Sequence, residues 1–354
     1  MRMPLVAVAA LLLTSCAAQS AVPSVSPTSA SESPTEVTCW ISPLTGACSH
    51  AGNSVLIVKI DDVAGARPQR GLNSADVILV EPVEGGLTRL MAVFQSDDPI
   101  EVGPVRSARI TDLDLVPAFG TPGFAYSGAT TKLRPMLDEG HLQLVGAPQG
   151  QFGFFRVDTQ DAPHNLIANT SALLSRIKDK EAARLMSATS WKFGSEGSSG
   201  LVTHSMTLQW AAAEKTFTWD PALKQWLIKV YDSPLESMRC CAATLERATT
   251  TTVFVMQTVL QDNPIKFHSG TVTPYPQTVG EGTGWVLTNG MRIEATWKRP
   301  TVYDLPRWFR EDGSEIAIQP GHVWWLIKTE RDDIVFQDTE AEASPQSASA
   351  SASS

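Results

Sequence analysis

Apolar residues form one unbroken run near the start of the chain and occur elsewhere in short runs. The first run extends from Leu5 to Leu13 and follows the basic residue Arg2. It is too short to span a bilayer as a helix, and a basic residue before a short apolar run is typical of a signal peptide. We therefore predict that residues 1–16 form an export signal.

Short apolar runs in the first half of the chain predict β-strands. They are rich in β-branched side chains, are bounded by Gly, Pro, Asn or Asp, and occupy residues 55–60, 77–80 and 89–94. Helix signals follow them, because Thr111 can cap a turn and Thr170 precedes the amphipathic stretch 172–177. This mixture predicts an α+β or α/β domain with a mixed sheet over residues 39–195.

The second half consists mainly of strand signals. Its earlier apolar runs occupy residues 205–210, 215–219, 225–231 and 251–259. The later runs, which are separated by Asn289-Gly290, Asp312-Gly313 and Pro320-Gly321, occupy residues 285–288, 291–297, 314–318 and 323–327. Asn-Gly between two apolar runs is a strong hairpin signal. We predict a mainly antiparallel β domain over residues 196–335.

Tryptophan is concentrated in this second half. Exposed indole rings could stack on sugars, but large aromatic residues more often fill the core of a sheet domain. We interpret these tryptophans as core residues: Trp210, Trp219, Trp226, Trp285, Trp297, Trp308, Trp324 and Trp325.

The two ends of the chain have a different composition. Residues 17–38 are rich in Ser, Pro and Ala, and residues 336–354 are rich in Ala and Ser, so we expect a disordered stalk and a disordered tail. The formal net charge is −9, which argues against a nucleic-acid partner and against electrostatic adhesion to anionic lipid.

Cys16 closes the export signal. The segment Leu13-Thr14-Ser15-Cys16 resembles the lipobox of bacterial lipoproteins, in which the cysteine receives acyl chains such as palmitate and becomes the new N-terminus. The resemblance implies that Cys16 anchors the protein to the extracytoplasmic face of the cell membrane. The alternative is ordinary secretion, with cleavage within residues 17–21.

Four further cysteines remain: Cys39, Cys48, Cys240 and Cys241. An even number outside the cytoplasm favours disulfide bonds. We favour a single loop from Cys39 to Cys48, or else a link from this pair to the adjacent pair Cys240-Cys241. A metal site is the competing interpretation, but no second cysteine pair at zinc-ligand spacing supports it. The chain also lacks His-Glu-x-x-His, a Walker loop and Gly-x-Gly-x-x-Gly, so we expect neither metal nor cofactor.

Acidic and basic residues are dense in the first half. The acids are Asp61, Asp76, Glu81 and Glu84, and the arginines are Arg67, Arg89, Arg106, Arg109 and Arg156. Arg106 and Arg109 are spaced to share one face if Ser107 begins a helical turn, and they would then clamp a carboxylate or phosphate. In the alternative, the arginines pair with Glu81 and Glu84 in a structural network, because charges among apolar strands need partners.

His164 is a candidate general base. It lies before a predicted helix, where loop residues often face a cleft, and it needs an orienting carboxylate such as Asp61, Glu81, Glu84 or Asp161. Asn165 is a candidate ligand-binding neighbour, and Tyr126 could supply a hydroxyl. A lone His is more often structural, and that interpretation stays open.

Several of these segments also carry a family resemblance. Pro43 to Gly46, Val58 to Asp61, Glu81 to Gly86, Val102 to Arg109 and Ala162 to Leu166 occur in the order typical of YerB-like lipoproteins. The chain is similar to this family over nearly its whole body, which implies an N-terminal and a C-terminal domain. The family is classed as one of unknown function, and the cysteines and tryptophans do not match its pattern.

Two functions follow as hypotheses. In the first, which we favour, a membrane-anchored lipoprotein of the cell envelope binds an anionic or glycan ligand, or a partner protein, in a cleft lined by Arg106, Arg109 and His164. In the second, a metal-independent hydrolase or transferase acts on cell-wall material, with Glu84 or Asp61 and His164 as acid and base. The sequence does not decide whether the protein is an enzyme.

Overall fold

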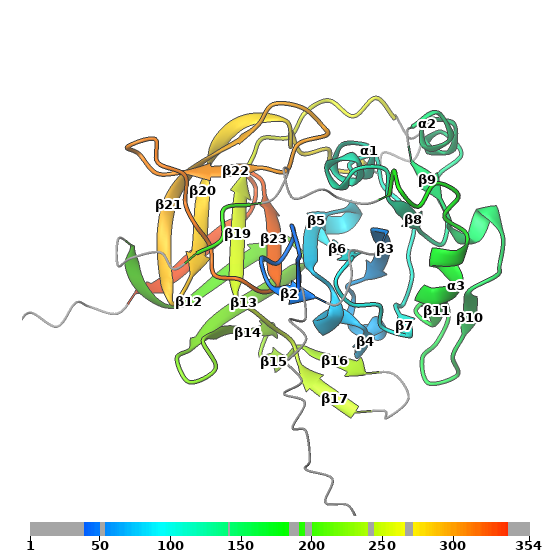
Figure 1. Ribbon diagram of the computed structural model, residues 1–354, viewed down its shortest axis with the longest axis horizontal. Helices are drawn as coiled ribbons and strands as arrows, with labels where there is room; N and C mark the ends of the chain where they lie inside the picture. Colours follow the sequence, from blue (N-terminus) through cyan, green and yellow to red (C-terminus); the bar gives the residue numbers. More distant parts are fainter. Residues whose placement is uncertain are drawn as a thin grey trace, which may run out of the picture. The chain divides into compact units, whose positions relative to one another are not determined.

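The computed structural model describes residues 39–49, 54–140, 142–183, 191–194, 200–239, 244–265 and 272–338. They belong to one compact unit, Cys39–Ser354, shown in Figure 1. The predicted export signal, the stalk and Cys16 lie outside the described residues, as do Cys240, Cys241 and the tail from residue 339. Within the described part of the chain, no helix is long and apolar enough to cross a membrane.

Most of the described residues with regular structure belong to one large sheet. Its strands, in order of pairing, are β15 (Ser233–Pro234), β14 (Gln225–Val230), β13 (Ala213–Asp220), β12 (Leu201–Trp210), β21 (Met291–Arg299), β20 (Gly280–Thr288), β19 (Thr252–Gln257), β23 (Val323–Lys328), β5 (Val77–Pro82), β6 (Thr88–Phe94), β3 (Leu56–Asp61), β8 (Gly123–Ala125) and β9 (Gln143–Leu144). Three strands pair outside this path: β18 (Thr249–Thr250), β22 (Arg307–Phe309) and β24 (Asp333–Asp338).

Smaller sheets and short helices complete the described body. The small sheets join β1 (Trp40–Ile41) to β2 (Cys48–Ser49), β10 (Phe154–Arg156) to β11 (Leu166–Asn169) and β7 (Glu101–Val102), and β17 (Thr244–Arg247) to β16 (Glu236–Arg239) and β4 (Gln69–Arg70). The helices are α1 (Asp112–Leu115), α2 (Leu133–Glu139) and α3 (Thr170–Ser175), with 3-10 turns at Ala64–Ala66, Leu72–Ser74, Glu84–Gly86, Val116–Phe119 and Ala147–Gln149. The protein is therefore mostly sheet with few helices.

The centre of the large sheet links the two halves of the chain. β23 pairs in parallel with β19 on one side and with β5 on the other. β3, β5 and β6 are buried along their whole length, as expected of strands that are covered on both faces. Their residues alternate between two hydrophobic clusters, with Leu56 and Val58 in one and Ile57 in the other.

The tryptophans of the second half mostly fill this core. Six of the eight are buried, namely Trp210, Trp226, Trp297, Trp308, Trp324 and Trp325. Trp219 and Trp285 are half-buried and pack against the same core. The core interpretation is confirmed for the six.

Some local predictions differ from the structure. Residues 314–318 do not form a strand, because only isolated bridges occur at Glu315 and Ile318. Thr111 precedes α1, but its side chain makes no capping hydrogen bond. Asn169, rather than Thr170, caps α3, and its side chain accepts a bond from the Ala172 amide at 2.9 Å. Residues 336–338, which we assigned to the tail, are the end of β24.

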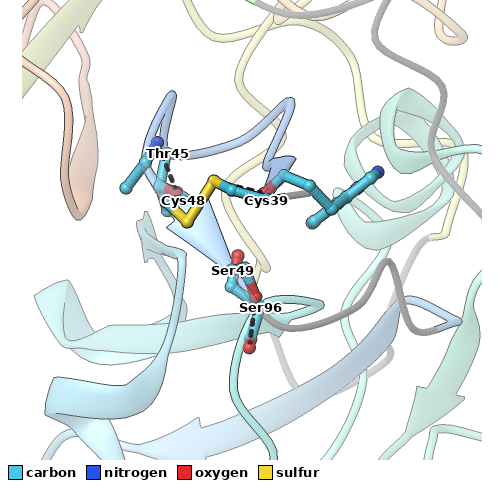
Figure 2. The surroundings of a disulfide bond; sticks show 7 residues. Cys39, Thr45, Cys48, Ser49 and Ser96 are labelled. Atoms are coloured by element: carbon cyan, nitrogen blue, oxygen red, sulfur yellow. Dashed lines mark hydrogen bonds between the residues drawn. A yellow bond between two sulfur atoms is a disulfide. The ribbon is translucent and has the colours of Figure 1, made fainter. Parts of the chain in front are cut away.

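A disulfide bond joins Cys39 to Cys48, as we favoured from the sequence. Figure 2 shows the bond beside β2, where the Ser49 hydroxyl donates to the Ser96 carbonyl at 3.0 Å. Between the two cysteines, Leu44 is fully buried in the core. The closed loop therefore fixes the start of the body against the main sheet.

Candidate functional site

Asp61 is the last residue of β3, and a second aspartate, Asp62, directly follows it. Asp61 lies opposite Arg89 of β6, and Arg89 in turn lies opposite Glu81 of β5. Directly opposed residues of antiparallel strands point to the same face of a sheet, so these three charged side chains share one face. Because Asp61 and Glu81 are fully buried, each requires a charged or hydrogen-bonding partner.

Asp61 binds three side chains from distant parts of the sequence. Its Oδ1 lies 3.0 Å from Arg89 Nη1, and its Oδ2 lies 2.9 Å from Arg106 Nε and 2.6 Å from His164 Nδ1. Main-chain bonds place these groups, because the Arg106 amide donates to the Lys59 carbonyl at 2.8 Å and the Asp61 amide donates to Pro104 at the same distance. The buried carboxylate thus orients both a guanidinium and an imidazole.

Asp62 forms a separate cluster with the second half of the chain. Lys215 of β13 is fully buried, and its Nζ lies 2.7 Å from Asp62 Oδ2. Thr88 donates its hydroxyl to the same oxygen at 2.5 Å, and Arg67 Nη2 donates to the Asp62 carbonyl at 2.7 Å. Burial lowers the pKa of Lys215, and the neighbouring Asp62 opposes this effect.

The turn that carries His164 also places a second arginine. Asn165 Oδ1 accepts a hydrogen bond from Arg156 Nη1 at 2.5 Å, and Asn165 Nδ2 donates to the Val157 carbonyl at 3.0 Å. Asn165 therefore positions Arg156 directly. The preceding residue, His164, shares the Asp61 carboxylate with Arg106.

An open cavity of about 370 Å³ lies beside this turn. Its walls comprise Val105, Arg106, Ser127, Ala147, Gln151, Phe154, Phe155, Arg156, Pro163 and Leu166. The lining contains two arginines and no carboxylate, whereas Glu294 and Glu311 line the cavity over β20 and β21. His164 itself is not part of the lining but follows Pro163, which is.

The Arg106 guanidinium is held at one end. Its Nε lies 2.9 Å from Asp61 Oδ2 in an ion pair but makes no hydrogen bond in the described part of the chain. The side chain keeps 22% of its surface exposed. Arg106 therefore lines the cavity while its guanidinium is paired with the buried Asp61 carboxylate.

A third charged cluster surrounds Glu81. Lys59 Nζ contacts Glu81 and lies 2.8 Å from Asp112 Oδ1, and all three side chains are fully buried. Burial and the neighbouring Asp112 raise the pKa of Glu81 to about 7, although Lys59 opposes this shift. Glu81 Oε2 has no hydrogen-bond partner in the described part of the chain, which favours a protonated carboxyl group.

Arg109 lies in a different environment from Arg106. Its Nε donates to Glu84 Oε2 at 2.8 Å, and its amide donates to Asp112 Oδ2 at 2.7 Å. Glu84 also contacts the Thr273 hydroxyl. Residues 106–109 are not helical, so the two arginines do not share the face of a helical turn. Arg109 thus has a structural partner, while Arg106 lines the cavity.

Tyr126 directly precedes the cavity residue Ser127, but its hydroxyl group is already hydrogen-bonded. It is buried, and its hydroxyl accepts a hydrogen bond from Gln149 Nε2 at 3.0 Å. Within the described ranges, no group of three or more His, Cys, Asp or Glu side chains is placed to hold a metal ion.

Several residues of these three clusters were not among our candidates. Lys59 had a usable signal, because a lysine inside the apolar run 55–60 must be partnered if that strand is buried. Asp62 had a weaker sequence signal, namely its position directly after Asp61. Lys215 and Asp112 had none, since their pairing depends on strands and turns that are distant in the sequence.

Comparisons with known proteins agree with this architecture. Residues 44–183 match the model "Protein of unknown function (DUF3048) N-terminal domain", and residues 206–325 match the corresponding C-terminal domain. The protein named "Putative lipoprotein YerB" from Bacillus subtilis (strain 168) is 36% identical over 109 residues, which cover 30% of this chain and 33% of that protein. The match therefore spans about a third of this relative.

A solved structure shows the same fold. The crystal structure of the YerB protein from Bacillus subtilis superposes with a TM-score of 0.67 and 21% sequence identity. The alignment covers 84% of this chain and 99% of that chain.

Proposed function

The chain belongs to the DUF3048 family, whose two domain models match most of it, and from this premise we propose that it is an envelope lipoprotein that binds an anionic ligand between Arg106 and Arg156. Anchoring through Cys16 is supported by the lipobox-like segment and by the name of the related YerB lipoprotein. The body would then lie on the extracytoplasmic face of the cell membrane, in reach of cell-wall glycans and envelope proteins.

The composition of the cavity carries the proposal. Two arginines and no carboxylate line it, in a chain whose formal net charge is −9. Guanidinium groups bind phosphate and carboxylate through charge-assisted hydrogen bonds, and each such bond typically contributes about 1.5–3 kcal/mol. Asp61 and Asn165 hold the two groups in place before a ligand arrives, which reduces the entropy lost on binding.

Titration of the purified body with inorganic phosphate, by calorimetry or NMR, tests the proposal. We expect R106Q and R156Q each to weaken phosphate binding about tenfold or more. R239Q is the matched control, because Arg239 is exposed and pairs with Glu246 away from the cavity. Phosphate binding that is absent from the wild type, or unchanged in both cavity variants, would refute the proposal.

A hydrolase or transferase acting on cell-wall material is the second candidate, and one observation favours it. The buried Asp61 holds His164 at Nδ1, which is how a carboxylate orients a general base. Ser127 supplies a hydroxyl to the cavity lining, and its Oγ lies 3.5 Å from Ser107 Oγ. A folded H164A variant that binds wall fragments but no longer converts them would establish catalysis. A fragment that the wild-type protein leaves unmodified would exclude catalysis on that fragment.

A further inference from the structure

The anion-binding cavity has an aromatic wall in addition to its arginines. Phe154 and Phe155 of β10 both line it, directly before Arg156. Phe154 is half-buried and packs against the hydrophobic core, so its position has a structural explanation. Phe155 lines the cavity, is 39% exposed and does not belong to either core cluster.

A simple anion would not require this wall. Phosphate or carboxylate alone gains its affinity from the guanidinium groups, and an exposed ring beside it adds nothing to those bonds. The face of an aromatic ring is electron-rich, and it attracts the positively polarised C–H groups on one face of a sugar ring. A ring next to two arginines therefore fits a ligand that has both an anionic group and a C–H face.

Polar side chains complete the same lining. Ser127 lies beside Arg106 in the cavity, because its amide donates to the Arg106 carbonyl at 2.9 Å. Gln151 is held by a bond from its Nε2 to the Ala147 carbonyl at 3.1 Å. A hydroxyl and an amide next to an aromatic ring can bond to the hydroxyl groups of a sugar.

We propose that the cavity binds an acidic glycan, in which Arg106 and Arg156 hold a phosphate or carboxylate group and Phe155 stacks on the sugar ring that carries it. This inference rests on the proposed anion-binding function. It adds the chemical class of the ligand and a specificity-determining residue, Phe155.

Four small probes separate the contributions: inorganic phosphate, glucose 6-phosphate, glucuronate and glucose. We expect at least one of the two acidic sugars to bind about tenfold more tightly than inorganic phosphate, since an aromatic contact contributes up to about this factor. Neutral glucose should bind far more weakly than either. A preference for glucose 6-phosphate indicates a phosphorylated glycan, and a preference for glucuronate indicates a carboxylated one.

Variants of Phe155 assign the gain to the ring. F155L keeps an apolar side chain but removes the aromatic face, so it should reduce the affinity for the acidic sugar to that for phosphate and leave phosphate binding unchanged. F155Y should retain the gain. F152A is the matched control, because Phe152 is 68% exposed in the turn before β10 and does not line the cavity. Melting temperatures of all three variants, measured in parallel, establish that they are folded.

The outcomes distinguish this inference from the function on which it rests. Equal affinities for phosphate and both acidic sugars, or a gain that survives in F155L, would overturn the glycan assignment while anion binding stands. Equal binding of glucose and the acidic sugars would overturn it as well. If no probe binds to the wild type, both the anion site and its glycan specificity are refuted.

Discussion

Asp61 is a buried carboxylate shared by Arg89, Arg106 and His164. D61N should lower the free energy of unfolding by about 3–5 kcal/mol, because it leaves the nearly buried Arg89 without its charge partner. Urea denaturation measures this loss. R106Q should cost no more than about 1 kcal/mol, since Arg106 is partly exposed and Asp61 keeps its other partners. Equal losses in both variants would mean that Arg106 supports the fold rather than a ligand.

Glu81 should make stability depend on pH. Burial and Asp112 raise its pKa from 4.5 to about 7 in the folded state. Between these values the folded protein retains a proton that the unfolded chain has released, so the contribution is fully present below pH 4.5 and is lost as the pH rises through 7. A rise of this size corresponds to about 3 kcal/mol. The glutamine of E81Q stays neutral at every pH. The unfolding free energy of E81Q minus that of the wild type should therefore increase by about 3 kcal/mol between pH 5 and 8.

Glu84 provides the contrast for that experiment. Burial acts to raise its pKa, but Arg109 and Thr273 outweigh burial and lower it. Its contribution is therefore present above its unfolded pKa and is lost as the pH falls through the lowered value. Relative to wild type, E84Q should be least stable near neutral pH, which is the opposite trend to E81Q. Parallel pH profiles for the two variants would contradict the assignment of the buried proton to Glu81.

At the scale of single residues, the sequence indicates which groups are charged but not which of them meet. The density of acids and arginines between residues 61 and 109 predicts a polar cluster. The division of that cluster depends on register, which places Asp61 against Arg89 and sends Asp62 toward Lys215. Spacing alone suggested that Arg106 and Arg109 act together, and the non-helical backbone between them separates their roles.

At the scale of elements, continuous apolar runs were the most informative signal. β3, β5, β6 and β23 lie close to their predicted bounds because they are buried on both faces. β24 was not predicted as a strand. Its side chains alternate between exposed and half-buried, both of its ends are acidic, and it borders the Ala/Ser-rich tail. Residues 314–318 lie between two turns, and a short run bounded by turns does not by itself form a strand.

The loop closed by Cys39 and Cys48 should stabilise its neighbours. C39S, or mild reduction, should lower the free energy of unfolding by about 2–3 kcal/mol, because the bond restricts the unfolded chain. The doubly substituted C39S/C48S variant serves as the control for effects of a new free thiol. Non-reducing mass spectrometry that finds both thiols alkylatable in the native protein would contradict the bond itself.

At the scale of the whole molecule, the anchoring that we propose depends on a single residue, Cys16. If Cys16 carries the acyl chains, C16S should yield an exported protein that no longer sediments with membranes after a carbonate wash. C48S is a suitable control, since that cysteine lies in the body and should leave membrane retention unchanged. Retention of C16S after the wash would show that another part of the protein holds it to the membrane.

The continuity of the main sheet predicts that the two halves unfold together. β23 joins β19 to β5, and the buried pair of Lys215 and Asp62 crosses between the same halves. K215M leaves Asp62 buried without its ammonium partner and should cost about 3–5 kcal/mol. The control is K229M, because Lys229 is exposed on the neighbouring strand β14.

Two readouts locate the effect of K215M. Tryptophan fluorescence reports mainly on the second half, and amide exchange in β3 reports on the first. We expect both to shift by the same free energy, because a strand of one half cannot leave the sheet without exposing a strand of the other. In the double variant D62N/K215M no buried charge remains unpaired, so its loss should be smaller than the sum of the two single losses by at least about 1 kcal/mol. Additive losses, or β3 amides that stay protected in K215M, would show that the two halves are energetically independent despite their shared sheet.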